Sequence, residues 1–283
     1  MPDRPTPAPS PAPGPWPAPR VEDLTGTPLP ELAEAAGGPD GPAPFLRWQL
    51  APPSVHRAWR AGAATGVLAD RRRGRSLVVV GAAEDAAALV AAVLDEAAPQ
   101  LVTLPRGTPD LLAAAHPALG ARLVGGDDWD WFWTRSAPAQ RLPGEADVVE
   151  LAVGGAGAPG PDAEPVRALL AAGNPRSSVR PGDAHAKRWV GVRSGRDVVA
   201  CVASTADDGG PAPHLAAVAT RPDLRGRGLG AAVTAAVTRL LLREAPVVTL
   251  GMYADNDVAR RMYGRLGWDC AHRFSSRRVR PSA

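Results

Sequence analysis

The sequence predicts an α/β protein in which helices cover a layered sheet, built from two similar halves. Runs of apolar, β-branched residues that read as strands alternate with stretches of helical periodicity. This strand–helix–strand–helix–strand order occurs over residues 77–135 and again over 215–274. A stretch rich in Gly, Pro and Ala, from Gly154 to Pro161, marks a loop near the boundary of the second half. Such alternation is typical of a layered sheet domain.

The first half follows a segment dominated by proline and alanine. Because proline removes backbone donors and favours extended conformers, we expect residues 1–44 to form a largely disordered tail. Residues 45–140 have the pattern of a folded domain. Its predicted strands cover 77–80, 101–104 and 129–133, and its predicted helices cover 85–97 and a segment that starts at 108. In the last strand, Trp129, Trp131 and Trp133 alternate with other residues, which predicts one aromatic face.

The second half, residues 147–280, contains more predicted elements. Strands are expected at 188–192, 198–204, 215–219, 247–252 and 269–274, and helices at 164–172, 228–243 and 256–266. The first two of these strands are separated by Ser194–Asp197, which has the composition of a hairpin turn. Both halves therefore end on a predicted strand.

Composition and charge exclude several classes of function. The net charge of +3 comes from scattered arginines, and the largest basic cluster, Arg71–Arg73 with Arg75, has no interleaved aromatic residues, so we expect no nucleic-acid partner. No run of 18 apolar residues and no signal-peptide pattern occurs, which predicts a cytoplasmic protein without a membrane partner. Cys201 and Cys270 have no Cys or His at metal-ligand spacing, so we expect buried free thiols and no metal.

The segment 215–230 carries the most informative pattern, a strand, a polar turn, a glycine-rich loop and the start of a helix. Gly226, Gly228 and Gly230 alternate, so no Cβ hinders approach to the backbone where the helix begins. The first amides of a helix lack internal partners and carry partial positive charge, which favours a pyrophosphate. Arg225 and Arg227 add positive charge. A tight turn that uses glycine only for its geometry is the structural alternative.

Two nucleotide-binding motifs do not describe this loop. No Gly-Lys-Ser or Gly-Lys-Thr follows, which excludes a P-loop. The spacing is Gly-x-Gly-x-Gly rather than Gly-x-Gly-x-x-Gly, which excludes the dinucleotide fingerprint.

The loop instead resembles the acetyl-CoA-binding motif of the GNAT superfamily of N-acetyltransferases, Arg/Gln-x-x-Gly-x-Gly/Ala. Arg225, Gly228 and Gly230 occupy its positions. Further along, Asn256, Ala259, Tyr263 and Leu266-Gly267-Trp268 resemble the family's Asn-x-x-Ala-x-x-x-Tyr-x-x-x-Gly-Phe signature. The resemblance covers residues 147–280 and is greatest to the FR47-like subgroup.

The resemblance implies a mixed, splayed α/β (α+β) sheet that opens between its fourth and fifth strands to receive the pantetheine arm. It assigns the backbone of Val218, Ala219 and Thr220 to the pantetheine and Asn256 to the same arm or the thioester. It places Tyr263 near the thioester sulfur as an acid for the leaving thiolate. It assigns the pyrophosphate to Arg225, Gly226, Arg227, Gly228, Leu229 and Gly230.

The function implied is that of an acetyl-CoA-dependent N-acetyltransferase in which a primary amine attacks the thioester directly in a ternary complex. The acceptor is a small molecule or a peptide, and the protein is a monomer or a homodimer without a bound metal. Two alternatives stay open. One is a non-catalytic acyl-CoA-binding regulatory module, and the other is an acyltransferase of another chain length, because the sequence does not fix the width of the acyl pocket.

The base that accepts the amine proton is not fixed by the motifs. His214 lies just before the strand predicted at 215–219 and has a suitable pKa in its unperturbed state, so it is a candidate. Asp207, Asp208 and Glu164 are alternatives that read equally as surface charges. Ordered water is a further proton path. A loop at 177–182 is a candidate for contact with the acceptor.

The first half is expected to be a degenerate GNAT-like domain that does not bind the cofactor. The loop after its first predicted strand, Gly81–Asp85, lacks the second and third glycines and both arginines, and it places acidic residues at the helix start. This half is expected to form the acceptor pocket or a platform for the active half. Trp129, Trp131 and Trp133 fit either a pocket lining or a core between the halves.

Overall fold

The computed structural model describes residues 20–37, 43–155, 157–206 and 210–282. The strands of the N-terminal half are β1 (Glu22–Asp23), β2 (Val55–Ala61), β3 (Ala64–Arg71), β4 (Gly74–Val80), β5 (Leu101–Pro105), β6 (Leu123–Val124) and β7 (Asp128–Thr134). Its helices are α1 (Leu29–Ala35), α2 (Pro44–Gln49), α3 (Ala83–Ala97), α4 (Thr108–Ala115) and α5 (Pro117–Gly120), with a 3-10 turn at Pro52–Ser54.

The C-terminal half begins at residue 145, and from residue 186 onward it repeats the order of three strands, a helix, a strand, a helix and a last strand. Its strands are β8 (Val149–Glu150), β9 (Gly154–Gly155), β10 (Ala158–Pro159), β11 (Ala186–Ser194), β12 (Asp197–Thr205), β13 (His214–Thr220), β14 (Val248–Tyr253) and β15 (Asp269–Val279). Its helices are α6 (Ala163–Gly173), α7 (Leu229–Leu241) and α8 (Asp257–Arg265), and 3-10 turns cover Glu145–Asp147 and Pro222–Leu224.

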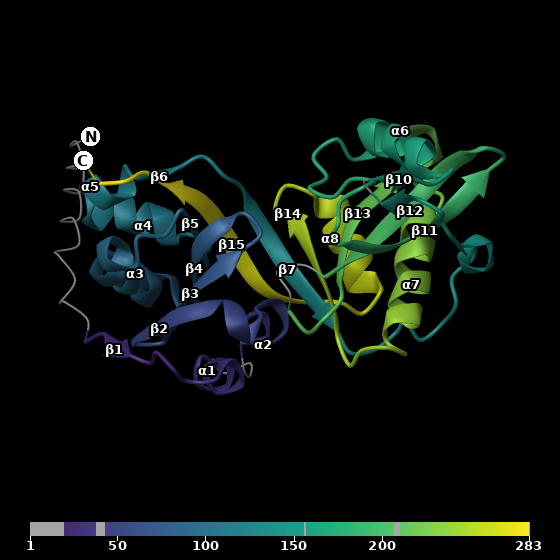
Figure 1. The fold of residues 1–283 in the computed structure, drawn as a ribbon. Coiled ribbons are helices and arrows are strands. Elements are labelled where there is room, and N and C mark those ends of the chain that lie inside the picture. Colours follow the sequence, from purple (N-terminus) through teal and green to yellow (C-terminus); the bar gives the residue numbers. More distant parts are fainter. Residues whose placement is uncertain (1–19, 38–42, 156, 207–209, 283) are drawn as a thin grey trace, which may run out of the picture.

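One mixed sheet runs through both halves. Among the described residues it has thirteen strands, in the order β1-β2-β3-β4-β5-β15-β7-β14-β13-β12-β11-β8, with β6 beside β15 (Figure 1). Most neighbours are antiparallel, but β4 with β5 and β13 with β14 are parallel. The predicted α/β class, a mixed sheet flanked by helices, is confirmed.

The two halves exchange their last strands. β15 of the C-terminal half pairs with β5 of the N-terminal half, from Phe274↔Pro105 to Arg278↔Leu101. Conversely, β7 of the N-terminal half pairs with β14 over six residues, from Val248↔Thr134 to Tyr253↔Trp129. The exchanged strands also pair with each other and run side by side through the middle of the molecule (Figure 1). Each half therefore completes the sheet of the other.

Helices bury both faces of the sheet through residues spaced three and four apart. In the N-terminal half, α3 buries Leu89, Val93 and neighbouring side chains against the strands. In the C-terminal half, α7 buries Val233, Val237 and Leu241 in one cluster, whereas α6 contributes to a separate cluster with β12 and β13. A further cluster packs α1 and α2 of the N-terminal half with residues of β2, β3 and β4, and also contains Trp131 of β7 and Phe274 of β15. None of the helices in the described ranges is long and apolar enough to cross a membrane.

Parts of this architecture differ from the sequence-based expectation. Within the segment predicted to be a largely disordered tail, α1 is helical, and its Leu32 and Ala33 are fully buried. Residues 1–19 lie outside the described residues. The hairpin of β2 and β3 was not predicted, because these strands contain four Ala residues and one Gly, which have low β-propensity. Their pairing with each other, and that of β3 with β4, stabilises them instead.

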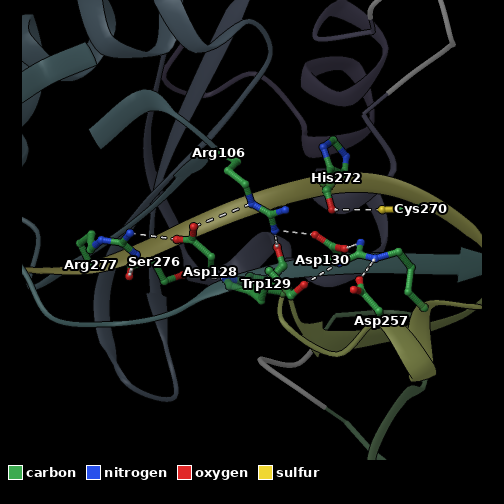
Figure 2. Close-up of polar contacts among 11 residues, drawn as sticks. Arg106, Asp128, Trp129, Asp130, Asp257, Cys270, His272, Ser276 and Arg277 are labelled. Atoms are coloured by element: carbon green, nitrogen blue, oxygen red, sulfur yellow. Dashed lines mark hydrogen bonds and ion pairs between the residues drawn. The ribbon is translucent and has the colours of Figure 1, made fainter. Parts of the chain in front are cut away.

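A buried charge cluster lies where the halves meet. Asp130 on β7 is fully buried, and its carboxylate accepts a hydrogen bond from Nη2 of Arg106 at 2.5 Å (Figure 2). Arg260 of α8 forms an ion pair with the same carboxylate. Arg106 follows β5 in the N-terminal half and Arg260 belongs to the C-terminal half, so one carboxylate binds a cation from each. A buried carboxylate requires such partners, because desolvation of an unpaired charge is costly.

Candidate functional site

The sheet opens between β13 and β14. These strands are parallel but pair at only two positions, His214↔Thr249 and Leu215↔Leu250. Beyond them, β13 stays paired with β12 as far as Thr220, and β14 stays paired with β7 as far as Tyr253. The two carboxyl ends therefore diverge, and we call the gap between them the wedge. In the main sheet this half contributes β8, β11, β12, β13, β14 and β15 in chain order. The wedge therefore lies between the fourth and fifth of these strands.

A bulge in β13 lines the wedge. The register with β12 shifts between Cys201↔Ala219 and Ala203↔Ala216, so that Ala217 and Val218 lie opposite one residue. Ala217 has a φ of +54°, a left-handed conformation that costs an alanine about 1–2 kcal/mol. Bulges redirect backbone groups out of the ladder. The carbonyl of Val218 accepts a hydrogen bond from Nδ2 of Asn174 at 3.1 Å instead of pairing with β14.

The loop that leaves β13 exposes bare backbone at the start of α7. Gly226 has a φ of +77° and Gly228, the N-cap, a φ of +83°, conformations that favour glycine. No side chain caps the helix, and the first helical turn closes with the amide of Ala232 on the carbonyl of Gly228 at 2.9 Å. The amides of Leu229 and Gly230 thus lack an acceptor within the helix. A Cβ built on Gly226 or Gly228 would meet no atom within 4 Å.

This geometry fits a pyrophosphate. Uncapped amides and the positive end of the α7 dipole point to the same place, and no side chain of the two glycines covers them. Gly230 has a packing role in addition, because a Cβ there would lie 3.2 Å from Oγ1 of Thr220. Leu229 packs on the core that contains α7. The residues named from the sequence therefore form one continuous strand–loop–helix surface.

The two arginines of the loop differ in their contacts. Nη2 of Arg225 donates to the carbonyl of Gly173 at 2.9 Å, which joins the loop to the end of α6. The side chain of Arg227 is exposed and makes no hydrogen bond or ion pair with the rest of the described chain. Its charge nevertheless acts on the nearby carboxylate of Asp223 and helps to lower the pKa of that group. The role of either group toward a phosphate stays a prediction.

Asn256 lies just before α8 and Tyr263 lies within it, as their spacing predicted. Oδ1 of Asn256 accepts from the amide of Ala259 at 3.0 Å and caps the helix. Tyr263 is only 4% exposed and packs between the rings of Phe132 and Trp268, with centroids 5.7 and 6.2 Å away. Burial raises the pKa of the Tyr263 phenol, so the group stays protonated at neutral pH. Its hydroxyl has no hydrogen-bond partner among the described residues.

His214 lies at the closed end of the wedge. It is 9% exposed, and its Nδ1 lies 2.9 Å from Oγ1 of Thr249 on β14. Leu215 and Leu250, the next residues on the two strands, belong to the cluster that contains Tyr263. Because side chains alternate along a strand, His214 and Tyr263 approach the sheet from opposite faces. The structure brings both to the region of the wedge without placing them in contact.

The other base candidates differ in position. Glu164 is exposed and pairs with Arg167 one turn along α6, which is a surface ion pair. Asp207 and Asp208 lie outside the described residues. In the loop at 177–182, Val179 is buried against α6, so this residue is part of the core. His214 is thus the candidate that lies at the junction of β13 and β14.

The segment after α6 crosses the wedge, a role that sequence patterns did not indicate. Asn174 binds β13 through Val218, and Arg176 stacks its guanidinium on the ring of Tyr253 in β14, 3.7 Å from the centroid. Arg176 also pairs with Asp255 at 2.6 Å and with Asp127 at 3.2 Å. These contacts join residues far apart in the chain, so no local motif could reveal them.

The matching helix start in the N-terminal half is closed. At the N-terminus of α3, the carboxylate of Asp85 accepts from the amide of Ala63 in the β2–β3 turn at 2.8 Å. A Cβ on Gly81 would lie 2.1 Å from the carbonyl oxygen of Ala63. The turn and the acidic side chain therefore occupy the space that stays open in front of α7.

The cysteines differ from one another. Cys201 is buried, and burial raises the pKa of its thiol to about 12, which makes it a poor nucleophile. The prediction that both thiols are buried is wrong for Cys270, which is exposed on β15. Within the described ranges, no three side chains of His, Cys, Asp or Glu come together in a way that could hold a metal ion.

Comparison with known structures identifies the fold. A GCN5-related N-acetyltransferase from Sphaerobacter thermophilus is 16% identical in sequence, with 93% of this chain and 97% of that chain covered, at a TM-score of 0.53. A GCN5-related N-acetyltransferase from Kribbella flavida is 20% identical, with 81% and 91% covered and a TM-score of 0.46. A tandem GNAT protein from the clavulanic acid biosynthesis pathway is 17% identical, with 93% and 99% covered and a TM-score of 0.44. The chain has the fold of the GNAT proteins.

The sequence comparison adds a narrower match. Residues 189–279, from β11 to the end of β15, match the model of the FR47-like protein family. A search of the curated proteins finds no match to this chain. The resemblance inferred from the two motifs is thereby confirmed, and it falls on the half that carries the open helix start.

Proposed function

We propose that this protein is an acetyl-CoA-dependent N-acetyltransferase that transfers an acetyl group to a primary amine in a ternary complex. The observation that best supports the proposal is the wedge between β13 and β14, which leads to the uncapped start of α7. A GNAT-type donor needs a slot for its extended arm and a cradle for its phosphates, and both occur side by side in this half.

The residues that would hold the donor follow from their geometry. The amides of Leu229 and Gly230, with the open backbone of Gly226 and Gly228, would bind the pyrophosphate, and the exposed guanidinium of Arg227 would add charge. β14 no longer pairs with Val218, Ala219 and Thr220 of β13, so backbone groups of this segment would be offered to the pantetheine, although the Val218 carbonyl already accepts from Asn174. Asn256 caps α8 through Oδ1, and its Nδ2 would donate to the pantetheine.

The chemistry requires two proton transfers at fixed positions. Bound acetyl-CoA supplies an activated acetyl group, the amine nitrogen forms a bond to its carbonyl carbon, and the carbon–sulfur bond breaks. The amine proton must leave, and the departing thiolate must gain one. Tyr263 is our candidate for the second task, because its hydroxyl makes no hydrogen bond within the described structure, although burial raises the pKa of the phenol and makes it a weaker acid. His214, on the other face, is our candidate for the first task.

The two halves would then have different roles. Residues 147–280 would form the catalytic half, and residues 45–140 a degenerate half that does not bind the donor. The closed start of α3, where Asp85 and the β2–β3 turn fill the cradle, supports this division. A carboxylate at that position also repels phosphate.

The alternative of a non-catalytic acyl-CoA-binding module predicts the same donor site, so binding alone does not distinguish it. The presence of both Tyr263 and His214 near the wedge favours the enzyme. An acyltransferase of another chain length differs only in the acyl pocket. Rates with acetyl, propionyl and hexanoyl donors would separate the two enzymes.

A matched pair of glycine variants tests the donor site. Gly228→Glu places a negative side chain in the cradle and should weaken acetyl-CoA binding at least 100-fold in calorimetric titration. Gly195→Glu is the control, because Gly195 also has a positive φ and an open surround but lies in the β11–β12 turn. It should suffer a similar loss of stability, about 1 kcal/mol, and keep its affinity. Equal affinity in both variants, or no affinity for acetyl-CoA in the native protein, would contradict the proposal.

A further inference from the structure

An exposed glycine marks the closed end of the wedge. Gly251 is the first residue of β14 beyond the two pairs with β13, and it is exposed, whereas Val248, Thr249, Leu250 and Met252 in the same strand are buried. A glycine in a strand interior commonly marks a close approach of a ligand or another backbone. Its backbone therefore forms an open floor at the point where the sheet splits.

The walls around this floor come from both halves. A Cβ placed on Gly251 would lie 3.4 Å from Cε3 and Cζ3 of Trp129 and 3.8 Å from Cε1 of His214. His214 belongs to β13 of the catalytic half, but Trp129 belongs to β7, the strand that the N-terminal half contributes to this sheet. The half without a donor cradle therefore places a side chain beside the proposed base.

The Trp129 ring is held in one orientation while part of it stays accessible. Its Nε1 donates to Oγ of Ser276 at 2.9 Å, and the ring contacts Phe274 and Phe45 with centroids 5.1 and 6.1 Å away. Trp131, two residues further along the strand, is fully buried, whereas Trp129 is only half-buried. A fixed, partly exposed aromatic surface at a wedge floor is suited to contact a flat apolar group.

Charged side chains lie beyond Gly251, around Tyr253 at the end of β14. Tyr253 pairs with Trp129 across the strands, and Arg176 stacks on Tyr253. Arg176 in turn lies between the carboxylates of Asp127 and Asp255. Each of these carboxylates, and the neighbouring Asp128, therefore has an arginine partner at this rim.

We infer that Trp129 and Gly251 form the acceptor subsite of the acetyl transfer, and that the acceptor is a primary amine attached to an aromatic or heteroaromatic group. This inference rests on the proposed function. In it, the amine lies beside His214 and the flat group contacts the Trp129 ring. The exchanged strand thus makes the N-terminal half a specificity-determining part of the site.

The experiment uses the full chain with Trp129→Leu, Trp129→Phe and the control Trp133→Leu. Trp133 is on the same strand and face, is also half-buried, and does not adjoin Gly251. Calorimetry measures binding of 2-phenylethylamine to protein saturated with coenzyme A. Release of free thiol from acetyl-CoA measures rates with 2-phenylethylamine, 1,4-diaminobutane and glucosamine.

We expect Trp129→Leu to weaken 2-phenylethylamine binding about tenfold, the size of one aromatic contact, and to lower its kcat/KM equally through KM. Trp129→Phe should recover most of the loss, Trp133→Leu should change nothing, and 1,4-diaminobutane should be affected less than twofold. Similar effects of Trp129→Leu and Trp133→Leu, no binding of 2-phenylethylamine, or a preference for a non-aromatic amine would overturn this inference alone. Absence of acetyl-CoA binding would overturn the proposed function with it.

Discussion

The carboxylate of Asp130 pairs with one arginine from each half of the molecule. It is fully buried on β7, and its two cations come from the β5–α4 loop and from α8. Nη2 of Arg106 also donates to the carbonyl of Trp129 at 3.0 Å, so the cluster fixes the strand that supplies the inferred acceptor wall (Figure 2). The removal of one member of a buried ion pair is strongly destabilising, because it leaves the other desolvated without compensation.

Asp130→Asn should therefore lower the free energy of unfolding by about 3–5 kcal/mol. Asp257→Asn is the matched control, because Asp257 pairs with the same Arg260 but is 73% exposed. Its effect should stay below about 1 kcal/mol. Urea unfolding monitored by circular dichroism measures both variants. Losses of the same size would mean that Arg260 does not need the buried carboxylate.

His272 is a second residue with a predictable energetic effect. It stacks on Phe274 with centroids 5.2 Å apart and contacts the rings of Phe45 and Trp131, and its buried Nε2 has no hydrogen-bond partner in the described structure. Burial lowers its pKa from 6.5 to about 4, because the charged imidazolium is poorly solvated in this aromatic cluster. The folded protein therefore binds this proton less readily than the unfolded chain.

Stability should consequently rise with pH between about 4 and 6.5, where the unfolded chain holds the proton and the folded protein does not. The contribution of His272 is complete above pH 6.5 and is lost as the pH falls toward 4, up to about 3 kcal/mol. His272→Phe should remove this part of the acid dependence. Thermal unfolding of both proteins at pH 4, 5.5 and 7 checks it, and parallel pH curves would contradict the assigned cause.

At the scale of elements, α7 and α8 show that similar helices can begin in opposite ways. α7 begins at a glycine without a side-chain cap, whereas Asn256 caps α8 with its own oxygen. An uncapped start leaves amides for a ligand, and a capped start stabilises the helix. Asn256 is expected to do both, through Oδ1 to Ala259 and through Nδ2 to the donor.

Two substitutions separate these roles of Asn256. Asn256→Ala should lower stability by about 1 kcal/mol, since the cap is lost, and should also weaken acetyl-CoA binding. Asn256→Asp keeps an oxygen at the cap but loses the amide donor, so it should restore stability without restoring affinity. Thermal unfolding and calorimetric titration measure the two effects. Recovery of affinity by Asn256→Asp would assign only the cap to this residue.

Local sequence patterns predicted those elements whose buried or exposed positions follow a regular spacing of apolar residues or glycines. The strands rich in Val and Leu, the helices α3, α6, α7 and α8, and the open glycine loop after β13 all follow from residues close together in sequence. The contacts of Asn174 with Val218 and of Arg176 with Tyr253 do not, because each joins segments far apart in the chain. The same applies to Gly251, whose exposure depends on where β13 leaves β14.

For the whole molecule, the exchange of β7 and β15 is the feature that no pattern within one half could reveal. The sequence predicts a terminal strand in each half and the correct order of helices. It does not predict which strands are neighbours, because the paired strands are about 100 or more residues apart and local propensity does not describe such contacts. Because β14 pairs with β7 over its whole length, the predicted boundary near residue 140 separates strands that are hydrogen-bonded neighbours.

A cut at residue 140 should consequently leave both fragments incompletely folded. Residues 140–283 lack β7, which leaves β14 without its antiparallel neighbour, and residues 1–139 lack β15 beside β5. We expect neither fragment alone to unfold cooperatively, and co-expression to restore cooperative unfolding and acetyl-CoA binding. Circular dichroism and calorimetry measure this. A fragment 140–283 that is stable and fully active would refute the shared sheet and the acceptor role of Trp129.

The exchange of β7 and β15 also determines how long β5 lacks its partner strand during translation. β5 leaves the ribosome long before β15, which ends 174 residues later, so at 5–20 residues per second its edge waits roughly 10–35 seconds for its partner. During that interval the apolar Val102 and Leu104 lie in a strand with an unsatisfied ladder, the kind of template on which nascent chains aggregate. Production of this protein should therefore depend on chaperones that shield one particular strand until translation has passed residue 279.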